Sequence, residues 1–137
     1  MRHLLLQAIV ASAFALASLA RAAGLDGLDP VSYFSGGQPI RGDAAISAAY
    51  RGETYQFASA QDRAAFVADP ERYLPQYGGY CAWAVAQNKL APGDPAVFKV
   101  VDGKLYLNVN RSIASRWEQD IPGFIRAADA NWPRLKR

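Results

Sequence analysis

The chain has 137 residues, with 15 basic and 12 acidic side chains. A length in this range predicts one domain, and a hydrophobic share of 51% excludes a wholly disordered chain. The single cysteine excludes a disulfide framework within the chain, and it excludes zinc and iron–sulfur centres that need several thiolates.

The first 22 residues have the three parts of a secretory signal peptide. Arg2 supplies a basic tip, an apolar run extends over residues 4–20, and residues 20–22 form the small–x–small site Ala-Arg-Ala. We expect cleavage after Ala22, which leaves a periplasmic or secreted domain of residues 23–137. The alternative is a membrane anchor, for which the apolar run is at the short end. No cysteine stands near the cleavage site, so we expect no lipid anchor after signal removal.

Removal of residues 1–22 would lower the net charge and remove residue types that catalysis and metal binding commonly use. Arg2 and Arg21 are lost, so 13 basic residues remain against 12 acidic ones, and the net charge falls from +3 to +1. The basic residues are interleaved with acids, and we expect no nucleic-acid partner. The only histidine, His3, and the only methionine, Met1, are also lost. Without the usual general base and the commonest transition-metal ligand, the balance is against an enzyme, and we expect no cofactor.

The first half of the mature chain begins with an irregular arm. Glycines and prolines dominate residues 24–42, around a short apolar island at residues 31–34. Aromatic and β-branched residues on both sides of Gly52 predict a β-hairpin over residues 48–57. Ser59 with Asp62 three residues later predicts a capped helix that ends before the Asp69-Pro70 pair, and Pro70 suits the start of a short new helix.

The second half contains the clearest hairpin pattern. We expect a short helix over residues 80–86 and a loop over residues 88–95. The Asp102-Gly103 pair between two apolar runs predicts a two-residue type I′ turn within residues 97–109. Ser112 is expected to cap the next helix, which restarts near Asp120 and Pro122 and closes at Pro133.

The two hairpins form a weak internal repeat. In each, a tyrosine stands three residues after the turn glycine, and a predicted helix follows. The offset from Gly52 to Gly103 is 51 residues. Two hairpin–helix units packed together predict an α+β fold, with small antiparallel hairpins against short helices in a single domain. The alternative is coincidence, because a hairpin followed by a helix is a common order.

Several ordered motifs resemble the YHS-domain family. The runs DPV at residues 29–31, YRGETYQF at 50–57 and FVADPERY at 66–73 carry this resemblance. An exported subgroup is similar over more of the chain, through DPVSYF at 29–34, YGGYCA at 77–82, DGKLYLN at 102–108 and NWP at 131–133. The similarity covers roughly residues 26–133, and that subgroup has no assigned activity.

The resemblance implies that a metal site has been lost. Metal-handling members of the family resemble this chain but have cysteines where it has Ser32, Ala58 and Asp62. None of these three residues supplies a thiolate, so no metal is expected at the family site. The leading hypothesis is therefore a non-catalytic accessory or binding module for an unknown small ligand or an exported protein. The alternative is a periplasmic protein that binds or delivers copper, zinc or mercury through Cys81 of two chains together with carboxylates.

Cys81 is the only thiol, and its role stays open at this point. It could be a nucleophile or redox group, as in a thiol enzyme, or form a disulfide-linked dimer, but a small buried residue is the commonest role of a free cysteine. Aromatic residues beside it could wall a pocket with polar edges. We assign the candidate ligand-binding set as Tyr77, Tyr80, Cys81 and Trp83. Asp26, Asp29 and Asp94 could bind a hard cation, although their spacing matches no calcium loop.

Overall fold

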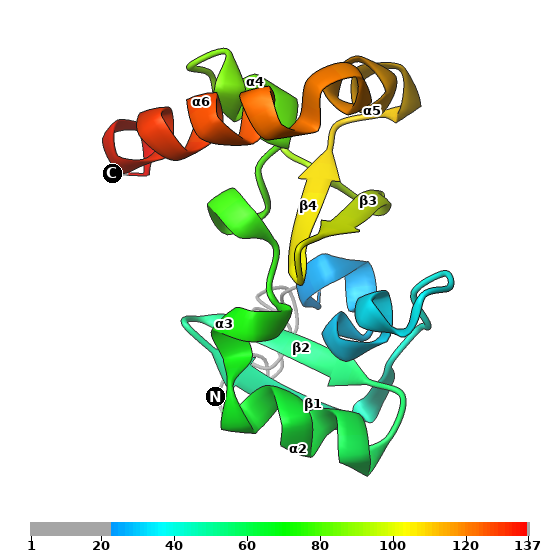
Figure 1. Ribbon diagram of the computed structural model, residues 1–137. Coiled ribbons are helices and arrows are strands. Elements are labelled where there is room, and N and C mark those ends of the chain that lie inside the picture. Colours follow the sequence, from blue (N-terminus) through cyan, green and yellow to red (C-terminus); the bar gives the residue numbers. More distant parts are fainter. Residues whose placement is uncertain (1–22, 137) are drawn as a thin grey trace, which may run out of the picture.

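The computed structural model describes residues 23–136. The expected signal peptide and its cleavage site precede Ala23 and lie outside the described residues. Within the described part, no helix is both long and apolar enough to span a bilayer. Two separate antiparallel hairpins and a set of short helices make up the chain (Figure 1), which confirms the α+β fold class.

The elements fall into two groups that follow each other along the chain. The first repeat comprises η1 (Gly24–Gly27), η2 (Pro30–Ser35), β1 (Asp43–Tyr50), β2 (Glu53–Phe57), α2 (Ala60–Ala68) and α3 (Pro70–Tyr73). The second repeat comprises η3 (Gln76–Gly79), α4 (Ala82–Ala86), β3 (Asp94–Val101), β4 (Lys104–Asn108), α5 (Arg111–Trp117), η4 (Glu118–Asp120) and α6 (Ile121–Leu135). Figure 1 shows the second repeat above the first.

The structure supports the internal repeat at the level of individual hydrogen bonds. The Asp29 amide donates to the Ile40 carbonyl at 2.8 Å, and the Cys81 amide donates to the Ala91 carbonyl at the same distance. Both hairpins have a register irregularity at the corresponding place, before Ser47 in one and before Phe98 in the other. These correspondences are far more specific than the order of elements, and they argue against coincidence. Equivalent residues of the two repeats are 52 positions apart up to Cys81 and 51 positions apart from Ala91 onward. The segment between Cys81 and Ala91 is therefore one residue shorter than the segment between Asp29 and Ile40.

Each hairpin turns through two residues with left-handed backbone geometry. Arg51 and Gly52 have φ values of 48° and 81°, and Asp102 and Gly103 have values of 51° and 74°. A type I′ turn requires positive φ at both central positions. The type I′ prediction for Asp102-Gly103 is confirmed, and the first hairpin has the same turn.

Helix capping follows the sequence signals with two corrections. The Ser59 hydroxyl accepts the Asp62 amide at 3.1 Å, as predicted. The predicted cap Ser112 is wrong, because the Asn110 side-chain oxygen accepts the Ile113 amide at 2.8 Å and the helix begins at Arg111. Pro133 does not end the last helix, which continues to Leu135. Pro133 lies in the final turn of α6, so the backbone donor that it removes and the crowding that it causes affect only the end of the helix.

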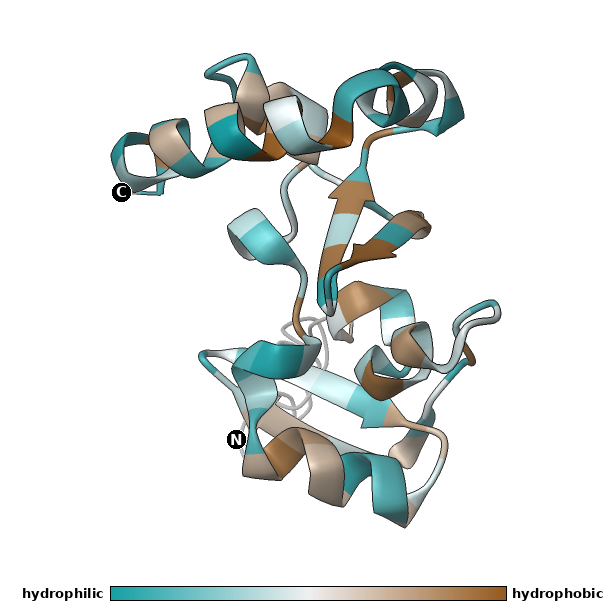
Figure 2. Cartoon of the chain, viewed as in Figure 1, coloured by the Kyte–Doolittle hydropathy of each residue, from teal (hydrophilic) through white to brown (hydrophobic). Residues whose placement is uncertain are grey.

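Three apolar clusters hold the chain together. One lies within each repeat, and the third joins them, through Tyr33 of the first repeat and Leu105 and Leu107 of the second. The Tyr33 ring meets Phe98 edge to face at 5.0 Å, and its hydroxyl donates to the Pro95 carbonyl at 2.6 Å. Strand β4 is therefore buried on both faces. Figure 2 shows this strand between the helices of its own repeat and the first repeat.

Candidate functional site: the cleft between the repeats

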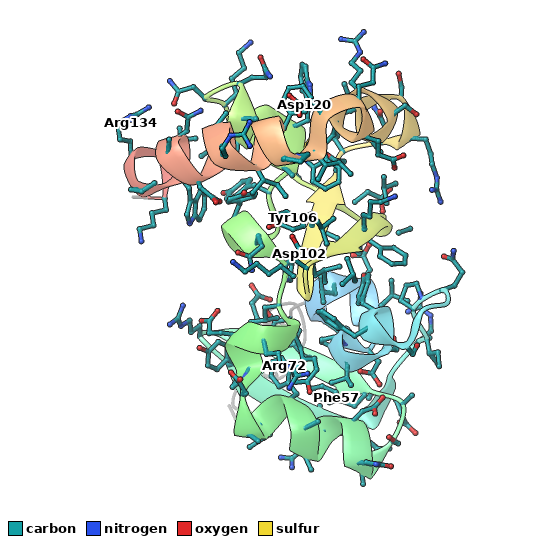
Figure 3. The ribbon with its side chains drawn as sticks, viewed as in Figure 1. Phe57, Arg72, Asp102, Tyr106, Asp120 and Arg134 are labelled. Atoms are coloured by element: carbon teal, nitrogen blue, oxygen red, sulfur yellow. The ribbon has the colours of Figure 1, made fainter. Side chains whose placement is uncertain are left out.

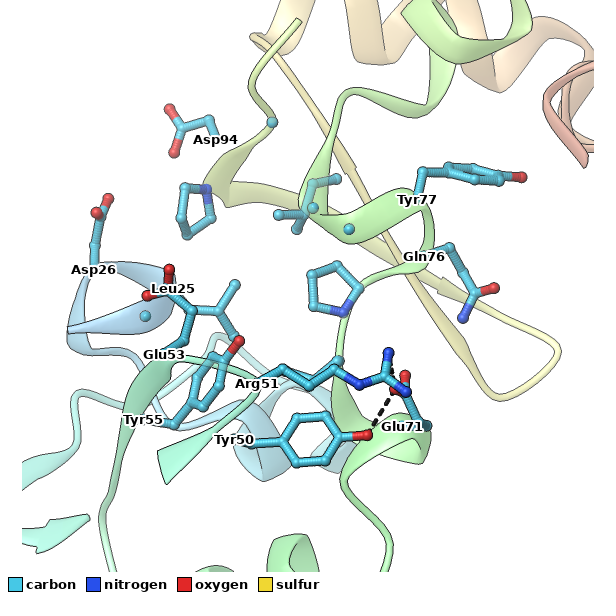
Figure 4. A pocket seen from close by; sticks show the side chains of 18 of the residues that line it. Leu25, Asp26, Tyr50, Arg51, Glu53, Tyr55, Glu71, Gln76, Tyr77 and Asp94 are labelled. Atoms are coloured by element: carbon cyan, nitrogen blue, oxygen red, sulfur yellow. Dashed lines mark hydrogen bonds and ion pairs between the residues drawn. The ribbon is translucent and has the colours of Figure 1, made fainter. Parts of the chain in front are cut away.

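A cleft of about 1040 Å³ lies where the two repeats meet (Figure 4). This volume is at the upper end of the range of about 300–1,000 Å³ that is typical of small-molecule sites. Both repeats contribute to its walls, so the site exists only in the packed chain. The lining residues include aromatic side chains, charged side chains and glycines. The aromatic ones are Tyr50, Tyr55, Tyr77 and Trp132, the charged ones are Asp26, Arg51, Glu53, Glu71, Asp94 and Lys136, and the glycines are Gly24, Gly78, Gly79 and Gly93.

Two corresponding left-handed turns stand at the cleft. In η1, Leu25 and Asp26 have φ values of 55° and 54°, and in η3, Tyr77 and Gly78 have values of 60° and 61°. Successive left-handed residues other than glycine are unfavourable, by roughly 1–2 kcal/mol each. The surrounding packing must therefore fix both turns, and such fixed backbone is often found at binding sites.

An anchored group of polar side chains forms one wall. The Arg51 guanidinium contacts the Glu71 carboxylate at 2.8 Å, and the Tyr50 hydroxyl donates to the same oxygen at 2.8 Å. The hydrogen bond to Glu71 is the main cause of a raised Tyr50 pKa. These contacts link the tip of the first hairpin to α3 and set the position of Arg51.

The opposite repeat contributes aromatic rings that are also held in place. The Tyr77 hydroxyl donates to the Asp129 carboxylate at 2.8 Å, and the Tyr77 ring lies 6.0 Å from that of Trp132. Burial, followed by this hydrogen bond, raises the Tyr77 pKa. Tyr77 therefore stays a neutral phenol at physiological pH, and α6 carries both of its partners.

The four residues predicted to form a ligand site do not come together. Tyr77 lines the cleft, but Tyr80, Cys81 and Trp83 are absent from its walls. The Tyr80 ring packs beside Trp132 at 6.1 Å, and the Arg116 guanidinium lies 5.9 Å from the centre of the Trp83 ring. Figure 3 shows the side chains of the described residues as sticks on the ribbon. The aromatic residues are close in sequence, but Tyr77 belongs to η3 and Trp83 to α4, and of the four predicted residues Tyr77 alone is among those that line the cleft.

Cys81 is fully buried, with its sulfur 3.4 Å from the Asn108 side-chain oxygen. A disulfide between two chains, or a reaction at this sulfur, would require the fold to open here. The same Asn108 oxygen accepts the Trp83 amide at 3.1 Å. In the first repeat, Asp29 stands at the position of Cys81, and Phe57 stands at that of Asn108. Asp29 accepts the corresponding amide, that of Val31, at 2.9 Å. The buried acceptor is therefore Asp29 in the first repeat, at the position of Cys81, but Asn108 in the second, at the position of Phe57.

The positions expected from the family's metal site gather around Asp29. Its two carboxylate oxygens accept the amides of Val31 and Ala58, each at 2.9 Å, and the Ser32 hydroxyl donates to its carbonyl at 2.6 Å. The hydrogen bond to Asp29, followed by burial and by the negative charge of Asp29, raises the pKa of Asp62 to about 6. Within residues 23–136, no three or more His, Cys, Asp and Glu side chains are grouped closely enough to hold a metal ion.

The raised Asp62 pKa predicts how stability changes with pH. The pKa of Asp62 is higher in the folded chain than in the unfolded chain, so protonated Asp62 adds to the free energy of unfolding below about pH 4. This contribution is lost as the pH rises through about 6. Asp62→Asn keeps a donor toward Asp29 at every pH. We expect the variant to be more stable than the wild type at pH 7.5, by about 1 kcal/mol once solvent screening of the half-exposed Asp62 is allowed for.

Urea denaturation at pH 4.5 and 7.5 measures this effect, with Asp43→Asn as the control for loss of one acidic charge. The advantage of Asp62→Asn should nearly vanish at pH 4.5, where Asp62 is protonated. An advantage that is larger at pH 4.5 than at 7.5 would contradict the prediction.

Several cleft residues were not predicted as site residues. The sequence offers no local pattern that marks Arg51, Glu71 or Lys136, because their place at the cleft depends on how the elements pack. Asp26 and Asp94 were considered as candidate cation ligands, and the structure does place both at the cleft. The internal repeat was the one signal that could have suggested a site between two units.

Comparison of the chain with models of protein families, with curated proteins and with solved structures finds no match. The resemblance to the YHS-domain family therefore rests on the motifs in the sequence and stays a prediction.

Proposed function

We propose that this chain is an exported, YHS-like binding module that holds a small ligand in the cleft between its two repeats. The cleft carries the proposal. It has the size of a ligand site, walls from both repeats, and side chains that hold one another in place: the Arg51–Glu71 ion pair lies within the wall, and Tyr77 is bonded to Asp129 behind it. Sites of this kind are concave, with apolar surface for affinity and a few placed polar groups for specificity.

A binding role fits the other chemical features of the chain better than catalysis. The one thiol is buried away from the cleft, and the mature chain as predicted contains no histidine to serve as a base. Tyr55 and Tyr77, the buried phenols that line the cleft, both have raised pKa values, caused first by burial. They are consequently suited to hydrogen bonding rather than to proton transfer near neutral pH.

Native mass spectrometry of protein purified from its natural compartment tests this function. We expect a non-covalent small-molecule adduct that disappears under denaturing conditions. Glu53→Trp places a bulky side chain at the cleft wall and should abolish the adduct. Thr54→Trp is the matched control, because neighbouring residues of a strand point to opposite faces and Thr54 is exposed outside the cleft. An adduct kept by Glu53→Trp, or lost equally in both variants, would contradict the cleft as the site.

A further inference from the structure

The charges on the cleft walls are unequal. Four acidic side chains line it, and the basic side chains among the lining residues are Arg51 and Lys136. Arg51 is already neutralised by Glu71 at 2.8 Å. Three carboxylates therefore remain against one ammonium group, and these three are Asp26, Glu53 and Asp94.

Figure 4 shows these three carboxylates on one side of the cleft and the Arg51–Glu71 pair on the other. Asp26 and Asp94 come from different repeats. Burial is the largest cause of the raised Tyr33 pKa, and the negative charges of Asp26 and Asp94 raise it further. The negative charges of both carboxylates therefore act on one phenol, whose hydroxyl donates to the Pro95 carbonyl where the repeats join. Glu53 acts in the same way on Tyr55.

Aromatic rings complete this arrangement. Tyr55 and Tyr50 line the cleft from the first hairpin, and Trp132 lines it from α6. The face of an aromatic ring attracts cations, most strongly for tryptophan. Carboxylates beside aromatic rings favour an organic cation over an anion of the same size, because the anion would be repelled by the carboxylates and would gain nothing from the rings.

We infer that the ligand of this cleft is a small organic cation with one or more amino groups on an apolar chain. This inference rests on the proposed function and adds the chemical class of the ligand. Positive amino groups would lie against Asp26, Glu53 and Asp94, and the apolar chain would lie along the aromatic rings. Lys136, which follows the last residue of α6, is the one basic group among the described lining residues without a described ion-pair partner.

Three probes with the same five-carbon chain test the inference. They are 1,5-diaminopentane, pentan-1-ol and glutarate, each titrated into the mature protein while backbone amide shifts are recorded by NMR. We expect saturable shifts with the diamine at amides of residues 24–26, 51–55 and 76–79, and at least tenfold weaker binding of the other two. Glu53→Gln and Asp26→Asn should each weaken diamine binding about fivefold, as expected for loss of one charge at ~4 Å in a water-like medium. Glu118→Gln, outside the cleft, should leave it unchanged.

Glutarate or pentanol binding as well as the diamine would overturn the cation inference while leaving a ligand-binding cleft in place. Saturable shifts with none of the three probes would also overturn it. The proposed function fails by a different result, the absence of a cleft-dependent adduct in the native mass spectrum.

Discussion

Trp117→Ala is expected to lower the free energy of unfolding by about 3–5 kcal/mol, the usual cost of truncating a buried large aromatic residue. Trp117 is 1% exposed and packs at 5.5 Å from the Tyr106 ring in the cluster that joins α4, α5 and α6. Small domains are stabilised by only about 5–15 kcal/mol. The variant should therefore unfold at markedly lower urea concentration, as followed by far-ultraviolet circular dichroism.

Trp117→Phe is the informative control. Phe66 occupies the corresponding position of the first repeat and packs at 5.3 Å from Tyr55, as Trp117 packs on Tyr106. The Trp117 ring nitrogen is buried without a hydrogen-bond partner among the described residues, so its removal leaves no other group unsatisfied. We expect a loss of about 1–2 kcal/mol, from the smaller ring. If Trp117→Phe costs as much as Trp117→Ala, then the two repeats do not share this packing position.

Asn108→Leu is expected to cost about 2 kcal/mol, although it replaces a polar buried side chain by an apolar one of similar size. Asn108 is 3% exposed, and its oxygen accepts the Trp83 amide and lies beside the Cys81 sulfur. Leucine leaves the Trp83 amide buried without an acceptor, which costs roughly 1–3 kcal/mol. Equilibrium unfolding in urea measures the loss. Cys81→Ala should cost less, because Asn108 still accepts the amide.

The first repeat suggests how to restore this hydrogen bond. Asp29 accepts the amide two residues later, and Cys81→Asp would place the same acceptor before Trp83. In a double-mutant cycle, Cys81→Asp should recover at least about 1 kcal/mol in the Asn108→Leu background and be unfavourable alone. Additive losses in the double variant would show that the acceptor has not been exchanged between the two positions.

Local chemistry predicted much of the fold, and longer-range packing decided the rest. The Asp102-Gly103 turn, the Ser59 cap and the Pro70 helix start depend on neighbouring residues alone, and all three are confirmed. The Ser112 prediction failed because Asn110, two residues earlier, offers an equally good cap oxygen. Leu105 and Tyr106 lie on opposite faces of β4 because successive strand side chains alternate, but alternation alone does not predict that both faces are covered, as they are here.

The cleft was beyond the sequence for a related reason. Asp26 and Asp94 are 68 residues apart in the sequence, and only the contact between the repeats brings them to one site. Tyr77 was predicted as a site residue from the aromatic cluster visible in the sequence, and it does line the cleft. Tyr80 and Trp83 share that cluster in sequence but are not among the lining residues, because the Tyr80 ring packs beside Trp132 and the Trp83 ring lies beside Arg116.

A crystal structure of the protein purified from its natural compartment, without added ligand, tests the central claim most directly. The account predicts electron density for one small molecule between the repeats, with amino groups against Asp26, Glu53 and Asp94 and its apolar part along Tyr55 and Trp132. A molecule bound elsewhere on the chain, or a cleft closed by direct contact between its two walls, would contradict it.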